Sequence, residues 1–303
     1  MPSPEIINCQ TATNLLEELS PRSRTFSSAS PSEWLFRGQA LAEWDLRPTA
    51  FRDESKLVYS AAEDHRDWAN WTNADQIAAE ADTVISFADE ADRAGLPLPG
   101  DLGSLHYRLR RLLLHGYMPT EENGQLQWPP RSTWEVVALA QHYGLATRFL
   151  DWTYSSYVAT YFAASDAVRE QRTGKMAIWA FSMKTWHVSG DQEYLPRYPA
   201  VVTAPYASNP NLRAQRAVHL AVPLSLELSE AAQREDYTTL LMQVDASVRR
   251  HGHGAFKKFT LDTKHAPHLL WHLAKEGVTA AQLFPGYAGA ARSVLELPWQ
   301  RPE

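Results

Sequence analysis

The sequence predicts an α+β fold in which a mixed β-sheet forms the core and a helical subdomain is inserted. Strand-like apolar segments occur in both halves of the chain, and helices with a 3.6-residue apolar period lie among them. From about residue 53 to residue 120 the pattern is helical, interrupted by one Gly/Pro loop. We therefore expect an N-terminal helix and a Ser-rich loop over residues 1–30. One domain over residues 31–303 follows, with a helical insertion at about residues 53–120.

Length and composition limit the classes of protein to which this chain could belong. A chain of 303 residues can bury a substantial core without disulfides, and its single cysteine, Cys9, fits a reducing compartment. The start, "MPSPEIINCQ", lacks a basic stretch followed by an apolar one, and no segment approaches about 18 uninterrupted apolar residues. These features predict a cytoplasmic protein with no membrane partner.

The N-terminal elements follow from local pattern. "TATNLLEELS" places Leu15, Leu16 and Leu19 on one helical face. A strand, "WLFRGQ", opens at Trp34. The next segment, "WDLRPTAFR", is expected to be extended and to end in a turn, because Pro48 disfavours helix in the residue before it.

The helical insertion contains two predicted helices, "NADQIAAEADTVISFADEADRAG" and "GSLHYRLRRLLLHG", separated by the loop "GLPLPGDLG". After it, "STWEVVALAQHYG" is expected to be a helix capped by Ser132 or Thr133 and ended by Gly144. The remaining expected elements are a strand "LATRFLDWT", a helix "SSYVATYFAASDAVREQ", a strand "GKMAIWAFSM", Pro-rich loop and strands over 195–223, a polar helix, a strand "AFKKFTLD", a helix "HAPHLLWHLAKEG" and a closing helix after "FPGYAG".

Three segments place polar groups within apolar runs, where they would be costly unless partnered. They contain Arg37 and Gln39; Gln141, His142, Thr147, Arg148 and Asp151; and Asn211, Arg213 and Gln215. An ordinary ion pair between Asp151 and either Arg37 or Arg148 would explain one such segment. Three together favour a functional site.

The passage from "RFLDWT" into a helix places Asp151, Trp152 and Thr153 near a helix N-terminus, where free amides favour an anionic group such as a pyrophosphate. The chain has no Gly-x-Gly-x-x-Gly, no P-loop and no Gly-x-Ser-x-Gly sequence, so those nucleotide and hydrolase motifs are excluded.

The histidines of "HAPHLLWHL" lie near one helical face, and His268 and His272 have the i, i+4 spacing that metals use. No glutamate occupies the position expected in a zinc protease, so a solvated face is favoured over a metal site. The "HGHG" segment at 251–254 is interpreted as a loop.

Four motifs in order carry a resemblance to a known family. They are "WLFRGQ…WDLRPTAFR", "AQHYGLATRFLDWTYSSYVATYFAA", "NPNLRAQRAVHL" and "LFPGYAG". Together they resemble the FRG-domain family, named for a Phe/Tyr-Arg-Gly triplet, here Phe36-Arg37-Gly38. The resemblance extends from about residue 11 to residue 295.

Some FRG members resemble ADP-ribosyltransferases, including phage-defence toxins that act on RNA. The resemblance implies an ADP-ribosyltransferase-like sheet whose first-strand arginine, Arg37, contacts NAD. Ala159, Phe162 and Ala163 fit the helical Ala-x-x-Phe-Ala pattern, whereas Asp151-Trp152-Thr153 replaces the usual Ser-Thr-Ser. The glutamate of that enzyme class has no clean counterpart.

The implied activity is cleavage of NAD and transfer of ADP-ribose to a macromolecule, with NAD as a substrate and without a metal. Arg37 would hold a phosphate or ribose, His142 would contact the ribose or carry a proton, Asp151 would stabilise the developing positive charge, and Gln215 would position the ribose. Further residues expected to contact NAD are Phe36, Gly38, Gln39, Gln141, Thr147, Arg148, Thr153 and Arg213.

The acceptor is expected to be RNA first and protein second, and a toxin would have an antitoxin or immunity partner. The net charge of −6 gives no overall attraction to nucleic acid, although two segments are locally basic. The first carries Arg108, Arg110 and Arg111, and the second carries Arg249, Arg250, Lys257 and Lys258. Ordinary solvated faces are the favoured interpretation of both.

Two alternatives remain open from the sequence. The chain could be a non-catalytic module that binds a nucleotide or a partner protein, with Arg37, Arg148 and Asp151 in a structural network. It could also hydrolyse NAD without an acceptor, using the same residues.

Overall fold

A computed structural model describes residues 4–30, 33–52, 71–99, 127–183, 200–203, 206, 209–221, 224–225, 237–238, 241–242, 245 and 256–302. Several expected features lie outside these residues: the second helix of the insertion, the "HGHG" loop, and the arginines at 108, 110, 111, 249 and 250.

The described residues form an α+β fold around a seven-stranded mixed sheet of order β1-β9-β5-β2-β4-β7-β6, which confirms the predicted class. Strand β1 runs parallel to β9, and the other neighbours are antiparallel. The strands are β1 (Glu5–Asn8), β2 (Trp34–Gln39), β4 (Leu150–Thr153), β5 (Lys175–Ser182), β6 (Ala200–Val202), β7 (Ala217–Ala221) and β9 (Phe256–Asp262). A separate pair is made by β3 (Gln127–Trp128) and β8 (Leu224–Ser225).

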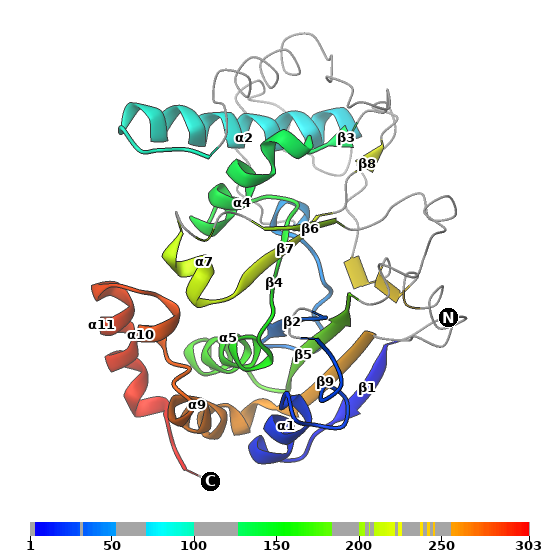
Figure 1. The fold of residues 1–303 in the computed structure, drawn as a ribbon, viewed down its shortest axis with the longest axis vertical. Helices are drawn as coiled ribbons and strands as arrows, with labels where there is room; N and C mark the ends of the chain where they lie inside the picture. The colour runs from blue at the N-terminus through cyan, green and yellow to red at the C-terminus, as the bar shows by residue number, and fades with distance from the viewer. Residues whose placement is uncertain are drawn as a thin grey trace.

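Helices cover the sheet in two groups (Figure 1). Helices α5, α9, α10 and α11 gather on one side, whereas α2 and α4 lie together beyond β6 and β7. The helices are α1 (Ala12–Leu19), α2 (Asn73–Arg93), α4 (Trp134–His142), α5 (Ser156–Arg169), α7 (Pro210–Ala214), α9 (Ala266–Lys275), α10 (Ala280–Leu283) and α11 (Tyr287–Glu296). Short 3₁₀ turns occupy Thr49–Phe51, Arg131–Thr133, Thr263–His265 and Leu297–Trp299.

Polar caps fix where the helices begin. Ser155 accepts a hydrogen bond from the Val158 amide at the start of α5, and Thr72 forms a capping box with Asp75 at the start of α2. At α4 the expected cap residue Thr133 behaves differently, because its hydroxyl donates to the Pro130 carbonyl. Gly144 follows α4 with a φ of 91°, a conformation that ends helices.

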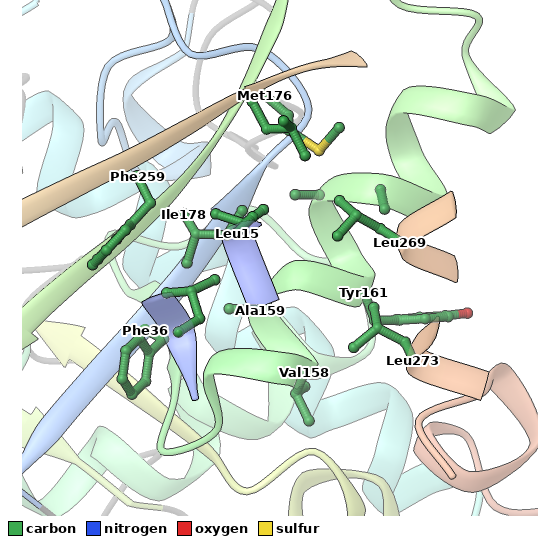
Figure 2. Close-up of a cluster of buried hydrophobic side chains, with 14 of the residues drawn as sticks. Leu15, Phe36, Val158, Ala159, Tyr161, Met176, Ile178, Phe259, Leu269 and Leu273 are labelled. Carbon is green, nitrogen blue, oxygen red and sulfur yellow. The ribbon is translucent and has the colours of Figure 1, made fainter. Parts of the chain in front are cut away.

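Helix α5 lies directly against strand β2. Side chains from α1, α5, α9 and the sheet meet in one buried cluster (Figure 2), which includes Phe36 and Ala159. Gly38 of β2 lies so close to α5 that a Cβ atom there would be 1.9 Å from the Ala159 carbonyl oxygen. The glycine of the Phe-Arg-Gly triplet therefore sets the distance between strand and helix.

Strands β2 and β4 separate within the sheet. β2 pairs with β5 at every position from Trp34 to Gln39, but with β4 only where Phe36 faces Thr153. The residues that follow Phe36 are thus free to face an opening between the two strands.

A buried ion pair joins α2 to the rest of the domain. Arg148 is 1% exposed, and its Nε and Nη2 atoms donate to the two carboxylate oxygens of Glu80 on α2, at 2.7 and 2.9 Å. The Trp128 indole also donates to Glu80. This network holds α2 against the end of the sheet that carries β6 and β7.

Candidate functional site

A cavity of about 940 Å³ opens where β2 and β4 separate. Its walls come from these two strands, from β7, from α5 and from the segment around residues 44–52. The structure brings nine predicted site residues to this cavity: Phe36, Arg37, Gly38, Gln39, Gln141, His142, Asp151, Thr153 and Gln215.

Arg37 crosses the opening between the strands. Its Nη1 atom donates to the backbone carbonyl of Asp151 at 2.6 Å, while its Nε atom is buried and has no partner among the described residues. The pKa of Arg37 is lowered to about 10, first by burial and further by the charge of Arg52, with Asp151 acting in the opposite direction. Arg37 still carries its charge at neutral pH.

The Asp151 carboxylate is held from two sides. Asp151 lies opposite His219 in the β4–β7 register, with its Oδ1 atom 3.4 Å from His219 Nε2. The Gln141 amide donates to the same oxygen at 2.5 Å, and the Gln141 oxygen accepts from the Thr147 hydroxyl. The Asp151 side chain is nevertheless 63% exposed, because it faces the cavity.

The electrostatics of the site keep Asp151 ionised. Desolvation alone would raise its pKa, but the hydrogen bond and charge of His219, the charge of Arg37 and the hydrogen bond from Gln141 together hold it below the ordinary value. The cavity therefore presents an accessible carboxylate beside a partly buried guanidinium.

His142 ends α4 at the cavity wall. Its Nε2 atom lies 3.2 Å from the side-chain amide nitrogen of Asn211, which donates to it in the neutral imidazole. Burial lowers the pKa of His142, the charge of Asp151 opposes this shift, and His219 adds to it. His142 is thus neutral at neutral pH and able to accept a proton.

Gln215 closes another part of the wall. Its amide donates to the Leu283 carbonyl at 3.1 Å, and its backbone carbonyl accepts from the Thr153 hydroxyl at 2.7 Å. Arg216, at a φ of 48°, then turns the chain from α7 into β7, the strand that carries His219.

Gln39 is tied into the protein. Its oxygen accepts from the Trp179 indole at 2.6 Å, and its nitrogen donates to the Asp45 carbonyl at 3.1 Å. It therefore orients the segment that carries Asp45, as well as lining the cavity.

Three predicted site residues do not line the cavity. Arg148 belongs to the buried pair with Glu80, Thr147 acts through Gln141, and Arg213 is exposed on α7. Arg37, Arg148 and Asp151 therefore do not form one structural network, because Arg148 is paired with Glu80. At the α5 N-terminus, the Ser156 hydroxyl donates to the Leu19 carbonyl, and Ala159 lines the cavity.

Several residues of the site were not predicted from the sequence. Arg47 and Arg52 line the cavity and lie within the motif "WDLRPTAFR". Their Arg-x₄-Arg spacing is the feature of the sequence that could have identified them. His219 interrupts the apolar strand "AVHLA" and is 2% exposed, so its polarity within a buried strand could have identified it. Neither signal shows that these side chains meet Arg37 and Asp151.

Other predicted features lie away from the cavity. Lys257 pairs with Glu5, and Lys258 donates to the Ala42 carbonyl while its amine lies over the Trp179 ring. Within the part of the chain that the structure describes, no group of three or more His, Cys, Asp or Glu side chains is arranged to hold a metal. None of the helices described there is both long and apolar enough to span a bilayer.

A model of the FRG domain family matches residues 103–172. The matched range includes α4, β4 and α5, and therefore Gln141, His142 and Asp151, but it does not reach the Phe-Arg-Gly triplet on β2. The match shows that this part of the chain is similar to the FRG domain, in agreement with the resemblance seen in the sequence motifs. No curated protein and no solved structure matches it.

Proposed function

We propose that this FRG-family protein is an ADP-ribosyltransferase-like enzyme that binds NAD in the cavity between β2 and β4 and cleaves its nicotinamide–ribose bond. The observation that carries the proposal is the arrangement of Arg37 and Asp151, a partly buried cation and an accessible carboxylate that meet at one opening in the sheet. A dinucleotide needs both, because its phosphates are anionic and its reacting carbon becomes positive.

The reaction would proceed by loss of a neutral leaving group. The bond between ribose C1′ and the nicotinamide nitrogen breaks, both electrons leave with nicotinamide, and positive charge develops at C1′. The ionised Asp151 would stabilise this charge by its proximity. Gln141 and His219 would hold the carboxylate in place.

Transfer then requires a nucleophile. An oxygen or nitrogen of the acceptor forms the new bond to C1′ and releases a proton, which passes to His142. The lowered pKa of His142 keeps the imidazole neutral and ready to accept it. Gln215 would position the ribose during this step.

The charge of the cavity supports an anionic substrate. Among the described residues, five arginines and three aspartates line it, an excess of two positive charges in a chain whose net charge is −6. RNA is the first proposed acceptor, protein the second, and a phage-defence or toxin–antitoxin role with an immunity partner belongs to the same proposal.

The proposal is tested by incubating the purified protein with NAD labelled in its adenylate half, together with total cellular RNA and protein. Wild type should release nicotinamide and leave label on one acceptor class, whereas Arg37→Lys should fold and lose turnover, because an ammonium cannot replace the planar guanidinium. Release without retained label would identify an NAD hydrolase. If wild type releases no nicotinamide and NAD leaves its melting temperature unchanged, the NAD proposal fails in favour of a non-catalytic module.

A further inference from the structure

Three arginines gather at one end of the cavity. The charge of Arg52 lowers the pKa of Arg37, which indicates that the two side chains lie near each other. The Arg52 Nε atom also donates to the Arg47 carbonyl at 3.2 Å. All three side chains line the cavity. Arg47 and Arg52 flank the Thr49–Phe51 turn, which therefore fixes their separation.

This cluster is poorly neutralised by the protein. Among the described residues, no carboxylate oxygen lies within 4.0 Å of a guanidinium nitrogen of Arg37 or Arg52, and Arg47 has only Asp45 at 3.9 Å. The Nε atoms of Arg37 and Arg47 are buried and also lack partners within the described ranges. Within the described ranges, these like charges therefore lie near one another with few counter-charges in contact.

We propose that Arg37, Arg47 and Arg52 form a diphosphate-binding subsite that orients a nucleoside diphosphate group beside Asp151. The inference rests on the proposed function, since NAD is the ligand that would bring the diphosphate. Guanidinium groups suit this role, because their forked donors bind phosphate oxygens in pairs.

The position of Arg37 connects the subsite to the chemistry. Arg37 donates to the backbone carbonyl of Asp151, so the arginine cluster contacts the residue that carries the carboxylate. The ribose attached to a phosphate on the cluster would then lie near Asp151. An RNA backbone could also supply phosphates, but the buried Nε atom of Arg37, beside the opening between β2 and β4, favours a small ligand.

The test measures binding of ADP-ribose, adenosine and a single-stranded oligoribonucleotide by calorimetry. The variants are Arg47→Gln and Arg52→Gln, with Arg22→Gln as the control, because Arg22 is exposed and does not line the cavity. Loss of one charged phosphate contact should weaken ADP-ribose binding at least about tenfold. The affinity for adenosine should be the same in all variants as in wild type. The control variant Arg22→Gln should bind ADP-ribose with wild-type affinity.

Two outcomes would overturn the subsite. One is ADP-ribose affinity equal to wild type in both folded variants. The other is a loss confined to the oligoribonucleotide, which would assign these arginines to an RNA backbone.

The subsite and the proposed function can fail separately. Arginine-dependent binding of ADP-ribose without nicotinamide release would uphold the subsite and reject the enzyme. Nicotinamide release with unchanged KM for NAD in Arg47→Gln and Arg52→Gln would uphold the enzyme and reject the subsite.

Discussion

Asp151 and His219 face each other across neighbouring strands β4 and β7, with 3.4 Å between carboxylate Oδ1 and imidazole Nε2. The pair places an ionised carboxylate on a rigid sheet rather than on a loop. Its contacts lower the pKa of Asp151 despite desolvation, so they favour the ionised folded state.

Stability should therefore depend on pH through Asp151. A lowered folded-state pKa means that the unfolded chain binds the proton more readily. The stabilisation is thus present above the ordinary aspartate pKa of about 3.9 and is lost as pH falls through the folded-state value. Wild type should unfold at higher urea than Asp151→Asn at pH 7, and the difference should shrink below about pH 4. A difference that is constant with pH would contradict the electrostatic origin.

His142 should titrate below the ordinary histidine pKa. Burial causes most of the shift, and the charge of Asp151 partly opposes it. Asp151→Asn should therefore lower the pKa of His142 further, as measured by imidazole NMR with the His142→Gln spectrum for assignment. An unchanged pKa of His142 in that variant would show that the Asp151 charge does not reach it.

Arg148 should be essential to folding rather than to ligand binding. Arg148→Met leaves Glu80 buried without its counter-charge, which should cost about 3–5 kcal/mol of unfolding free energy. Combining it with Glu80→Gln should restore part of that loss, because the amide oxygen can still accept from Trp128. Arg93→Met removes an exposed pair with Glu90 and should cost less than about 1 kcal/mol. Equal losses in the two single arginine variants would refute the buried-pair account.

Gly38→Ala should destabilise the protein by about 3 kcal/mol, because the new methyl group would overlap the Ala159 carbonyl of α5. Gly277→Ala is the matched control. Its φ of 75° is strained for alanine, but nothing lies within 4 Å, so about 1 kcal/mol is expected. Urea denaturation of both variants measures the difference, and a Gly38→Ala protein as stable as wild type would exclude the close strand–helix contact.

Much of the fold was predictable because its elements carry strong local signals. The strands containing Arg37, Trp179 and Phe259 and the helices α1, α4, α5 and α9 follow from apolar pattern and turn residues. Strand β1 was missed, since four largely exposed residues at an edge of the sheet leave no clear alternation.

The site was only partly predictable because its partners are distant in sequence. Arg37 and Asp151 were identified as polar residues in apolar runs, but the contact proved to involve the Asp151 carbonyl. Glu80 resembles any acidic residue on a helix until the fold places it against Arg148. His219 faces Asp151 only through the β4–β7 register, which local pattern does not determine.

The most direct test of the central claim is the rate of nicotinamide release from NAD by wild type, Asp151→Asn and the exposed-site control Asp92→Asn. If the Asp151 carboxylate stabilises the charge that develops at C1′, Asp151→Asn should remain folded at pH 7 and slow release by about 100-fold or more, with Asp92→Asn unchanged. Release by folded Asp151→Asn at the wild-type rate would contradict the claim.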